Sequence, residues 1–412
     1  MTKVLFLIFS IITTTLYSQQ KLSLSELYHK QLYPELELRN IDKSNPNYYF
    51  YKAAFAHASN KNTLSINYLD SLENIGISDT IAFDYCVLKF DNYVKLFDYK
   101  NAAANILTGV EQFESILTEP QKRGLMGAYN LWLAAADVLP QQIQHFGTCK
   151  IPYTRDQHGL ANIQVTINGV DTNFIFDTGA EKSNITESLA KALGFRFLVG
   201  NFPLRGSTGA TSNMRLAVAP SLRIGNINIE NVLFNVVPDY TLTFGNYKIN
   251  GIIGLTVAKE LGTLIFEKDT LTVNPFKQMD KGQAKNLFLK LGYPIVLLTY
   301  GGRTLPFLFD TGSATSTFYN PFYIDYKDSL KGKHRSQRYQ GLGGSNSYKV
   351  LIIKSLEMKL AQSTVSFSNL VIHKNDAHAP MQSLYGIIGQ DLLQNYKRMI
   401  ISFDENYLRL EH

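Results

Sequence analysis

Residues Phe174–Ala180 read F-I-F-D-T-G-A, and residues Phe307–Ser313 repeat this pattern as F-L-F-D-T-G-S. Each copy is an apolar, strand-like run that ends at Asp-Thr-Gly. Because side chains alternate along a strand, Asp177 leaves the first strand on the same side as Ile175. The glycine that follows permits close approaches that other residues cannot make. A carboxylate where a buried strand turns is costly, so two of them in matching settings indicate a shared site.

The sequence around the two copies also repeats, and the spacing between matched segments is nearly constant. Turn-forming residues precede each strand, G-I-I-G follows each aspartate at almost the same distance, and each half finishes on a strand-like tail. We therefore expect the C-terminal two-thirds of the chain to be one unit written twice. The matched segments are Asn168-Gly169 with Gly301-Gly302, Gly251–Gly254 with Gly386–Gly389, Arg215–Leu222 with Lys349–Leu356, and Thr263–Val273 with Met399–Leu410.

The duplicated pattern resembles the aspartic proteases of the pepsin and retropepsin type, over about residues 150–412. In that family a D-T-G or D-S-G loop from each of two lobes meets at a pseudo-twofold axis. An apolar-apolar-Gly segment packs behind each loop, and Ile252–Gly254 and Ile387–Gly389 match that segment. The first lobe has no clear counterpart of the pepsin flap tyrosine, and the short lobes look more like two fused retropepsin subunits.

The resemblance implies an aspartic endopeptidase in which Asp177 and Asp310 are catalytic. Two carboxylates ~3 Å apart cannot both ionise cheaply, so the pair would hold one proton and activate a shared water. By the same resemblance, two threonine hydroxyls cross-link the loops beneath the pair, and two glycines let the loops approach. These positioning residues are Thr178, Gly179, Thr311 and Gly312.

Two polar, glycine-rich stretches hold the same relative place in the two halves, at Leu204–Met214 and Arg338–Tyr348. We expect each to be a flap, a β-hairpin that closes over an extended peptide substrate, rather than an ordinary surface hairpin. The flap candidates are Gly206, Gly209, Tyr339, Gly341 and Gly343.

The N-terminal residues 1–18 have the pattern of a signal peptide. Lys3 precedes the apolar run Val4–Ile12, and a small polar stretch follows it. The run is shorter than the ~20 residues that a membrane helix needs, which favours cleavage over an uncleaved anchor. We therefore expect an exported bacterial protein, periplasmic or secreted, with no integral membrane segment after cleavage.

Residues 19–146 are expected to form a helical domain. Its paired helices with small contact residues resemble tetratricopeptide-like repeats. Three interpretations stay open: a docking surface for a protein partner, a prosegment-like cover over the protease, or a packing domain with no partner. The expected helices are Tyr48–Ser59, Thr63–Leu72, Ile81–Phe97, Ala102–Phe113 and Gln121–Leu139.

The predicted fold is therefore multidomain, with a helical, repeat-like domain followed by an all-β bilobal acid-protease fold with pseudo-twofold symmetry. Lobe 1 would span 147–275 and lobe 2 would span 291–412, joined by a connector over 276–290. Within that connector, Lys277–Lys290 is polar and is expected to be helical.

Composition excludes several other classes of function. The net charge of +6 comes from 40 basic and 34 acidic residues without a basic block, so nucleic acid is not an expected partner. Cys86 and Cys149 could pair after export, or Cys86 could stay a buried thiol. His373 and His378 are expected in a solvated loop, and we expect no metal and no cofactor.

The sequence leaves two rivals to a constitutive peptidase. One is a non-catalytic peptide-binding protein on a protease fold. The other is a protease that its own helical domain holds inactive.

Overall fold

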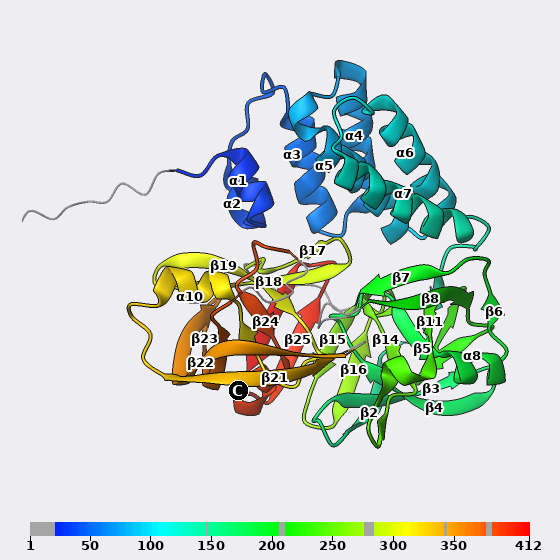
Figure 1. Cartoon of the computed structure of the whole chain (residues 1–412), viewed down its shortest axis with the longest axis vertical. Helices are drawn as coiled ribbons and strands as arrows, with labels where there is room; N and C mark the ends of the chain where they lie inside the picture. Colours follow the sequence, from blue (N-terminus) through cyan, green and yellow to red (C-terminus); the bar gives the residue numbers. More distant parts are fainter. Residues whose placement is uncertain (1–20, 146, 206–210, 276–283, 342–343, 376–380) are drawn as a thin grey trace, which may run out of the picture.

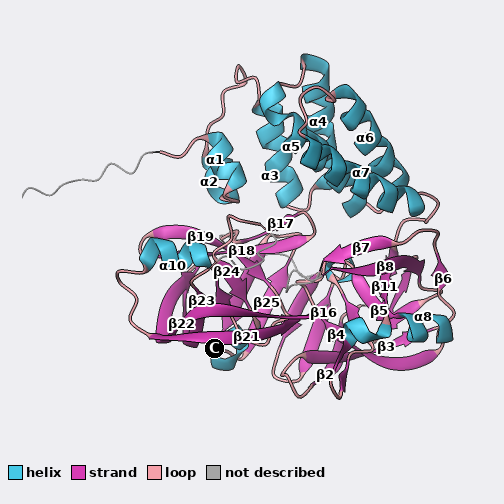
Figure 2. Cartoon of the chain, in the orientation of Figure 1, coloured by secondary structure: helices cyan, strands magenta, loops and turns pink. Residues whose placement is uncertain are grey.

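A helical region precedes a large β-rich region in the computed structural model of the chain (Figures 1 and 2). The structure describes residues 21–145, 147–205, 211–275, 284–341, 344–375 and 381–412. The expected order of a helical domain followed by a bilobal β fold is thereby confirmed. The expected signal peptide lies outside the described residues, and the tetratricopeptide-like repeat stays a prediction.

The expected helices are present, with ends shifted by a few residues. Thr118 and Gln121 form a capping box at the start of α7, which supplies partners for the first backbone amides. That helix ends at Ala134, earlier than expected, because Ala135–Val138 continue as tight turns. The helices are α1 (Leu24–His29), α2 (Tyr33–Leu38), α3 (Tyr48–Ala58), α4 (Asn62–Ile75), η1 (Asp79–Ile81), α5 (Ala82–Lys95), α6 (Tyr99–Gln112) and α7 (Glu119–Ala134).

In lobe 1 the outer strands β2 and β3 alternate buried residues with less buried ones, whereas β11 and β14 are buried throughout. The Asn168-Gly169 turn joins β3 to β4 with positive φ at both residues, as the sequence predicts for a tight hairpin. Its elements are β2 (Cys149–Arg155), β3 (Ala161–Ile167), β4 (Val170–Phe176), β5 (Ser183–Thr186), α8 (Glu187–Ala192), β6 (Arg196–Phe197), β7 (Phe202–Arg205), β8 (Thr211–Val218), β9 (Leu222–Ile224), β10 (Ile227–Glu230), β11 (Leu233–Val237), η2 (Asp239–Leu242), β12 (Thr243–Phe244), β13 (Tyr247–Lys248), β14 (Gly251–Ile253), α9 (Leu255–Ala258), β15 (Thr263–Phe266) and β16 (Thr270–Asn274).

Lobe 2 repeats this plan with a longer central hairpin. Gly301-Gly302 again gives a turn with positive φ at both residues, between β18 and β19. Its elements are β17 (Leu287–Lys290), β18 (Tyr293–Tyr300), β19 (Arg303–Phe309), β20 (Thr317–Phe318), α10 (Asn320–Tyr326), β21 (Lys333–Gly341), β22 (Gly344–Leu360), β23 (Ser363–His373), β24 (Gly386–Ile388), η3 (Gln390–Asn395), β25 (Arg398–Ser402) and β26 (Tyr407–Glu411).

Two short strands lie where the sequence predicts helical structure. The expectation of a helix over Lys277–Lys290 is wrong at its C-terminal end, because Leu287–Lys290 forms β17 and pairs with β18. Leu287–Leu289 are three consecutive apolar residues, and all three are buried. They do not have the three- or four-residue spacing of an amphipathic helix. Residues 276–283 of the same stretch lie outside the described residues. In addition, β1 (Gln142–Gln144) pairs with β10 of lobe 1.

The strand-like tails of the two halves meet in one sheet, in the order β26-β25-β15-β16-β2. The pairing of β15 with β25 is antiparallel, and Leu264 lies opposite Ile401. Equivalent strands that run antiparallel side by side are related by a local twofold rotation. This sheet therefore joins the lobes and carries the pseudo-twofold symmetry that the duplicated sequence predicts.

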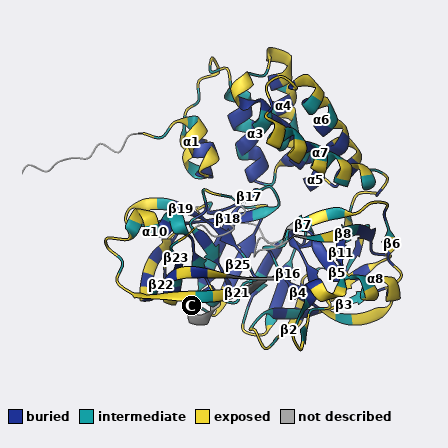
Figure 3. Ribbon diagram, in the orientation of Figure 1, coloured by how far each residue is buried: buried dark blue, intermediate teal, exposed yellow. Residues whose placement is uncertain are grey.

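The helical region packs against both lobes through a continuous apolar cluster. Figure 3 shows that buried residues occur in the helices and in both lobes. Phe288 of β17 contacts the rings of Tyr33 and Phe55, with centroids 5.4 and 6.4 Å away. On the lobe 1 side, Lys259 Nζ donates to the backbone carbonyl of Lys95 at 3.2 Å. Buried contacts thus hold the helical region on the β-rich region.

Candidate active site

Asp177 and Asp310 each begin a loop at the point where a central strand ends. The preceding strands, β4 and β19, pair in parallel with β14 and β24, the two G-I-I segments. Asp177 N donates to the carbonyl of Ile253 at 2.9 Å, and Asp310 N donates to that of Ile388 at 2.9 Å. The last backbone hydrogen bond of each strand pair is therefore donated by the aspartate itself.

The two loops meet so closely that each aspartate lies against the other loop's glycine. A Cβ atom placed on Gly179 would lie 2.4 Å from Asp310 Cγ, and one on Gly312 would lie 2.3 Å from Asp177 Cγ. Such contacts are too short for any residue with a side chain. The two carboxyl groups are close enough for each to shift the pKa of the other. The glycines thus make room for the paired carboxyl groups.

Thr178 and Thr311 cross-link the loops in a symmetric set of four hydrogen bonds. Thr178 Oγ1 donates to the carbonyl of Phe309 at 3.1 Å and accepts from Thr311 N at 3.1 Å. Thr311 Oγ1 donates to the carbonyl of Phe176 at 2.8 Å and accepts from Thr178 N at 3.0 Å. Both threonines are buried, so every one of these polar groups depends on its partner in the other lobe.

Backbone amides hold the outer face of each carboxylate. Gly179 N and Ala180 N donate to Asp177 Oδ1 at 2.8 and 3.1 Å. Gly312 N donates to Asp310 Oδ1 at 2.7 Å. These donors fix the orientation of the carboxyl groups and stabilise one negative charge on the pair.

The pair favours a shared proton. Burial raises the pKa of Asp177, while hydrogen bonds from Asp310 and from the loop amides lower it in part. Burial, followed by the charge of Asp177 and the hydrogen bond between the two groups, raises the pKa of Asp310 well above its ordinary value. Because the groups interact this strongly, the protons belong to the pair and not to either residue.

The expected flaps are hairpins in the described residues. β7 pairs with β8, and Leu204 and Met214 join an apolar cluster with Ile175 and Ile252. Ile175 shares a strand face with Asp177, so the base of this hairpin lies on the side of the sheet from which the carboxyl group projects. Gly206 and Gly209 lie outside the described residues.

In lobe 2, Tyr339 and Gly341 lie in β21, which pairs with β22. Gly343 lies outside the described residues. Closure of either hairpin over a substrate stays a prediction.

Several residues support the loops without having been singled out in the sequence. Ser183 Oγ accepts from Gly254 N at 3.1 Å, and Ser316 Oγ accepts from Gly389 N at 3.0 Å. The two serines have the same separation in the sequence as the two aspartates, and this equality could have identified them. Gln390 donates to the carbonyl of Thr311 and accepts from Arg155, which ties lobe 1 to the lobe 2 loop.

The histidine expected to be solvated is buried instead. His373 ends β23, and its ring packs 4.6 Å from that of Tyr348 and 6.2 Å from that of Tyr319. Burial lowers the pKa of His373 to about 4. These two tyrosines come from other segments of lobe 2, so the sequence next to His373 does not reveal that they cover it. His378 lies outside the described residues.

The cysteines are free thiols buried in different parts of the molecule. Cys86 faces Gly109 among the helices, and Cys149 faces Gly225 in lobe 1. Of the two interpretations left open, the buried thiol at Cys86 is the one that the structure shows. Among the described residues, no three His, Cys, Asp or Glu side chains are grouped as a metal site would require.

Comparison with known families gives one match. Residues 163–257 match the family model described as aspartyl protease, a segment that contains Asp177 and the first G-I-I-G. A search of curated proteins found no match. The family match supports an aspartic protease fold and a protease-like function with peptide substrates. In the part of the chain that the structure describes, no helix has the length and apolar character needed to cross a membrane.

Proposed function

We propose that the chain is an aspartic endopeptidase that hydrolyses peptide bonds with a water activated between Asp177 and Asp310. The observation that carries the proposal is the contact of the two carboxyl groups across paired D-T-G loops, each against the other's glycine. The family match to residues 163–257 supports the same chemistry for the first half of the site.

The mechanism follows from one proton on two carboxyl groups. The ionised member accepts a proton from the bound water, which makes that water nucleophilic. The protonated member donates to the oxygen of the scissile carbonyl as the tetrahedral intermediate forms. No covalent intermediate with the protein is needed, because the nucleophile is water. Activity should therefore fall both at low pH, where the base is lost, and at high pH, where the acid is lost.

The substrate is an extended peptide or protein segment. An edge of β-structure can hold such a segment by main-chain hydrogen bonds, and the hairpins β7–β8 and β21–β22 are the strands that we expect to supply them. We also propose export to the periplasm or the medium of a bacterium, because residues 1–18 have the pattern of a signal peptide.

A peptide-library digest with mass-spectrometric readout across pH 3–8 tests the proposal. Asp177→Asn and Asp310→Asn should each lower turnover on the order of 10³-fold, because an amide cannot replace either proton-transfer role. Asp171→Asn is the matched control, since Asp171 lies exposed on β4, the strand that leads to Asp177, and its change should leave turnover intact.

Turnover that survives in both dyad variants would refute the proposal. Capture of peptides by the unmodified protein without any cleavage would instead support the rival of a non-catalytic peptide binder.

A further inference from the structure

The loop that follows Asp310 is held by a carboxylate of its own lobe. Ser316 N donates to Asp391 Oδ2 at 2.9 Å, and Ser316 Oγ donates to Asp391 Oδ1 at 2.6 Å. Gly389 N in turn donates to Ser316 Oγ. Asp391 is the second residue after the G-I-I-G of lobe 2, so this lobe fixes its loop internally.

Lobe 1 has Thr256 at the position equivalent to Asp391, and a threonine cannot supply that carboxylate. Two backbone hydrogen bonds join this position to the loop after Asp177: Leu255 N donates to the carbonyl of Ala180 at 2.8 Å, and Thr256 N donates to that of Glu181 at 3.1 Å. The backbone carbonyl of Thr256 is bonded by a residue from outside lobe 1: Gln141 Nε2 donates to it at 3.1 Å. Gln141 belongs to the segment that leaves the helical region.

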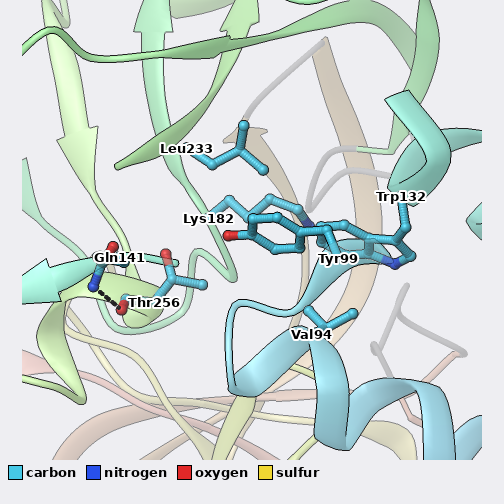
Figure 4. A pocket seen from close by; sticks show the side chains of 7 residues that line it. All are labelled: Val94, Tyr99, Trp132, Gln141, Lys182, Leu233 and Thr256. Carbon is cyan, nitrogen blue, oxygen red and sulfur yellow. Dashed lines mark hydrogen bonds between the residues drawn. The ribbon is translucent and has the colours of Figure 1, made fainter. Parts of the chain in front are cut away.

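The same loop is held a second time by the helical region itself (Figure 4). Lys182 is buried, and its Nζ lies 4.8 Å from the ring centre of Trp132 on α7. The Trp132 ring stacks on Tyr99 of α6, with centroids 5.2 Å apart and planes inclined by 3°. Next to Trp132, Leu131 packs against the apolar cluster that contains Ile175, a residue on the face of β4 that carries Asp177.

These contacts converge on the loop that directly follows Asp177. The carbonyls of Ala180 and Glu181 accept from the two residues that follow G-I-I-G. Lys182 extends toward the stacked rings of Tyr99 and Trp132 (Figure 4). Glu181 Oε1 also accepts from Lys182 Nζ at 2.5 Å, which satisfies the buried ammonium. A cation over an aromatic face is a directional contact, and a dry setting strengthens it.

We propose that Trp132, supported by Tyr99, is a positioning residue for the reaction, and that it places the Asp177 loop through Lys182. The inference rests on the proposed function. On this proposal the helical region supports the Asp177 loop, as Asp391 supports the Asp310 loop in lobe 2. The proposal also opposes the interpretation of that region as a cover that must be removed for activity.

Trp132→Ala in the full chain tests the inference. A dyad tolerates little displacement, so kcat should fall about 100-fold while KM changes less than about threefold. Trp132→Phe keeps an aromatic face and should restore kcat to within about threefold of the unmodified protein. If the loops separate, the charge of Asp177 raises the pKa of Asp310 less, so the high-pH limb of the activity profile should move to lower pH.

Phe113→Ala is the matched control. Phe113 is a buried aromatic residue of the helical region that contacts Tyr85 and not the loop. Its loss should lower the melting temperature without changing kcat or the pH profile. If Trp132→Ala does not fold, Lys182→Met decides instead, because it keeps the side-chain length and removes the ammonium, with its contacts to Trp132 and Glu181.

The outcomes separate the two proposals. Loss of kcat in Trp132→Ala with rescue by Trp132→Phe supports the positioning role. A kcat equal to that of Phe113→Ala, or a gain of activity, overturns it. Turnover that persists in Asp310→Asn overturns the proposed function itself, whatever Trp132 does.

Discussion

At the scale of single residues, the central feature of this molecule is a pair of carboxyl groups, each held against the glycine of the other loop. Asp177 and Asp310 are partly buried, lie against each other's loop and accept hydrogen bonds from loop amides. Burial and mutual repulsion raise the pKa of Asp310 well above its ordinary value, so folding favours the protonated form of that group.

This shift makes stability depend on pH in a definite direction. A group whose pKa is raised in the folded state stabilises the fold below its unfolded pKa, and that contribution is lost as pH rises through the folded pKa. Asparagine stays neutral at every pH and mimics the protonated acid. Asp310→Asn should therefore have a higher melting temperature than the unmodified protein at pH 8, with the difference shrinking toward pH 4.

Thermal denaturation followed by circular dichroism across that pH range measures the difference. Asp171→Asn again serves as the control, because Asp171 is exposed and should show no such trend. A melting temperature of Asp310→Asn at or below that of the unmodified protein at pH 8 would contradict the raised pKa.

The sequence could reveal the residues of the dyad because their signal is local. A carboxylate at the end of an apolar strand, followed by Thr-Gly and repeated once, identifies Asp177 and Asp310 without a structure. The supports of the loops carry no such signal. Lys182 and Trp132 are distant in the sequence and meet only because α7 docks on lobe 1, and Asp391 is recognised only by its contact with Ser316.

At the scale of elements, each D-T-G loop follows a strand that pairs in parallel with a G-I-I segment. The glycine that ends each G-I-I-G lies where a side chain would strike backbone. A Cβ atom on Gly254 would lie 2.5 Å from the carbonyl carbon of Lys182, and one on Gly389 would lie 2.6 Å from the carbonyl oxygen of Ser313. Neither contact can be relieved by turning a side chain.

Gly254→Ala should consequently destabilise the protein by about 2 kcal/mol or more, because the backbone of the active loop must move to admit the methyl group. Activity should fall with stability, since the displaced loop carries Asp177. Urea denaturation gives the free energy of unfolding, and the peptide digest gives the activity.

Gly124→Ala is the opposite control. Gly124 is exposed within α7 and nothing lies near the added methyl group, so the change should stabilise the protein by about 0.5–1 kcal/mol. If the two substitutions had equal effects on stability, the steric explanation for Gly254 would be wrong.

Elements with strong periodicity or clear turns were predictable, and short buried ones were not. Asn168-Gly169 and Gly301-Gly302 mark hairpins because positive φ suits these residues. By contrast, β17 is a short strand whose apolar run fits a helix or a strand equally well. This segment forms a strand because it pairs with β18, and that pairing cannot be read from the local sequence.

At the scale of the whole molecule, the helical region and the two lobes share one buried apolar cluster. Phe288, on β17 of lobe 2, is fully buried against aromatic rings of the helices. We therefore expect the helical region to unfold together with the lobes and not as an independent domain.

Phe288→Ala tests this coupling, because the change lies in lobe 2 and unfolding can be followed in the helical region. Trp132 is the chain's only tryptophan, so its fluorescence measures the unfolding of that region. Loss of the buried ring should cost about 3–5 kcal/mol, and the urea midpoint followed by Trp132 fluorescence should fall accordingly. Ile324→Ala, at an exposed position of α10, should leave that midpoint unchanged. An unchanged midpoint in Phe288→Ala would mean that the helices unfold on their own.

The seam between β15 and β25 has a consequence for how such a molecule could arise. In this seam each strand pairs antiparallel with its own counterpart, and Leu264 faces Ile401. An edge of this kind is self-complementary, so one half already has the surface needed to join an identical copy in an isologous dimer. Fusion of two copies would free each half to diverge, and the two halves differ at this point: lobe 2 has Asp391 bonded to its loop, where lobe 1 has Thr256.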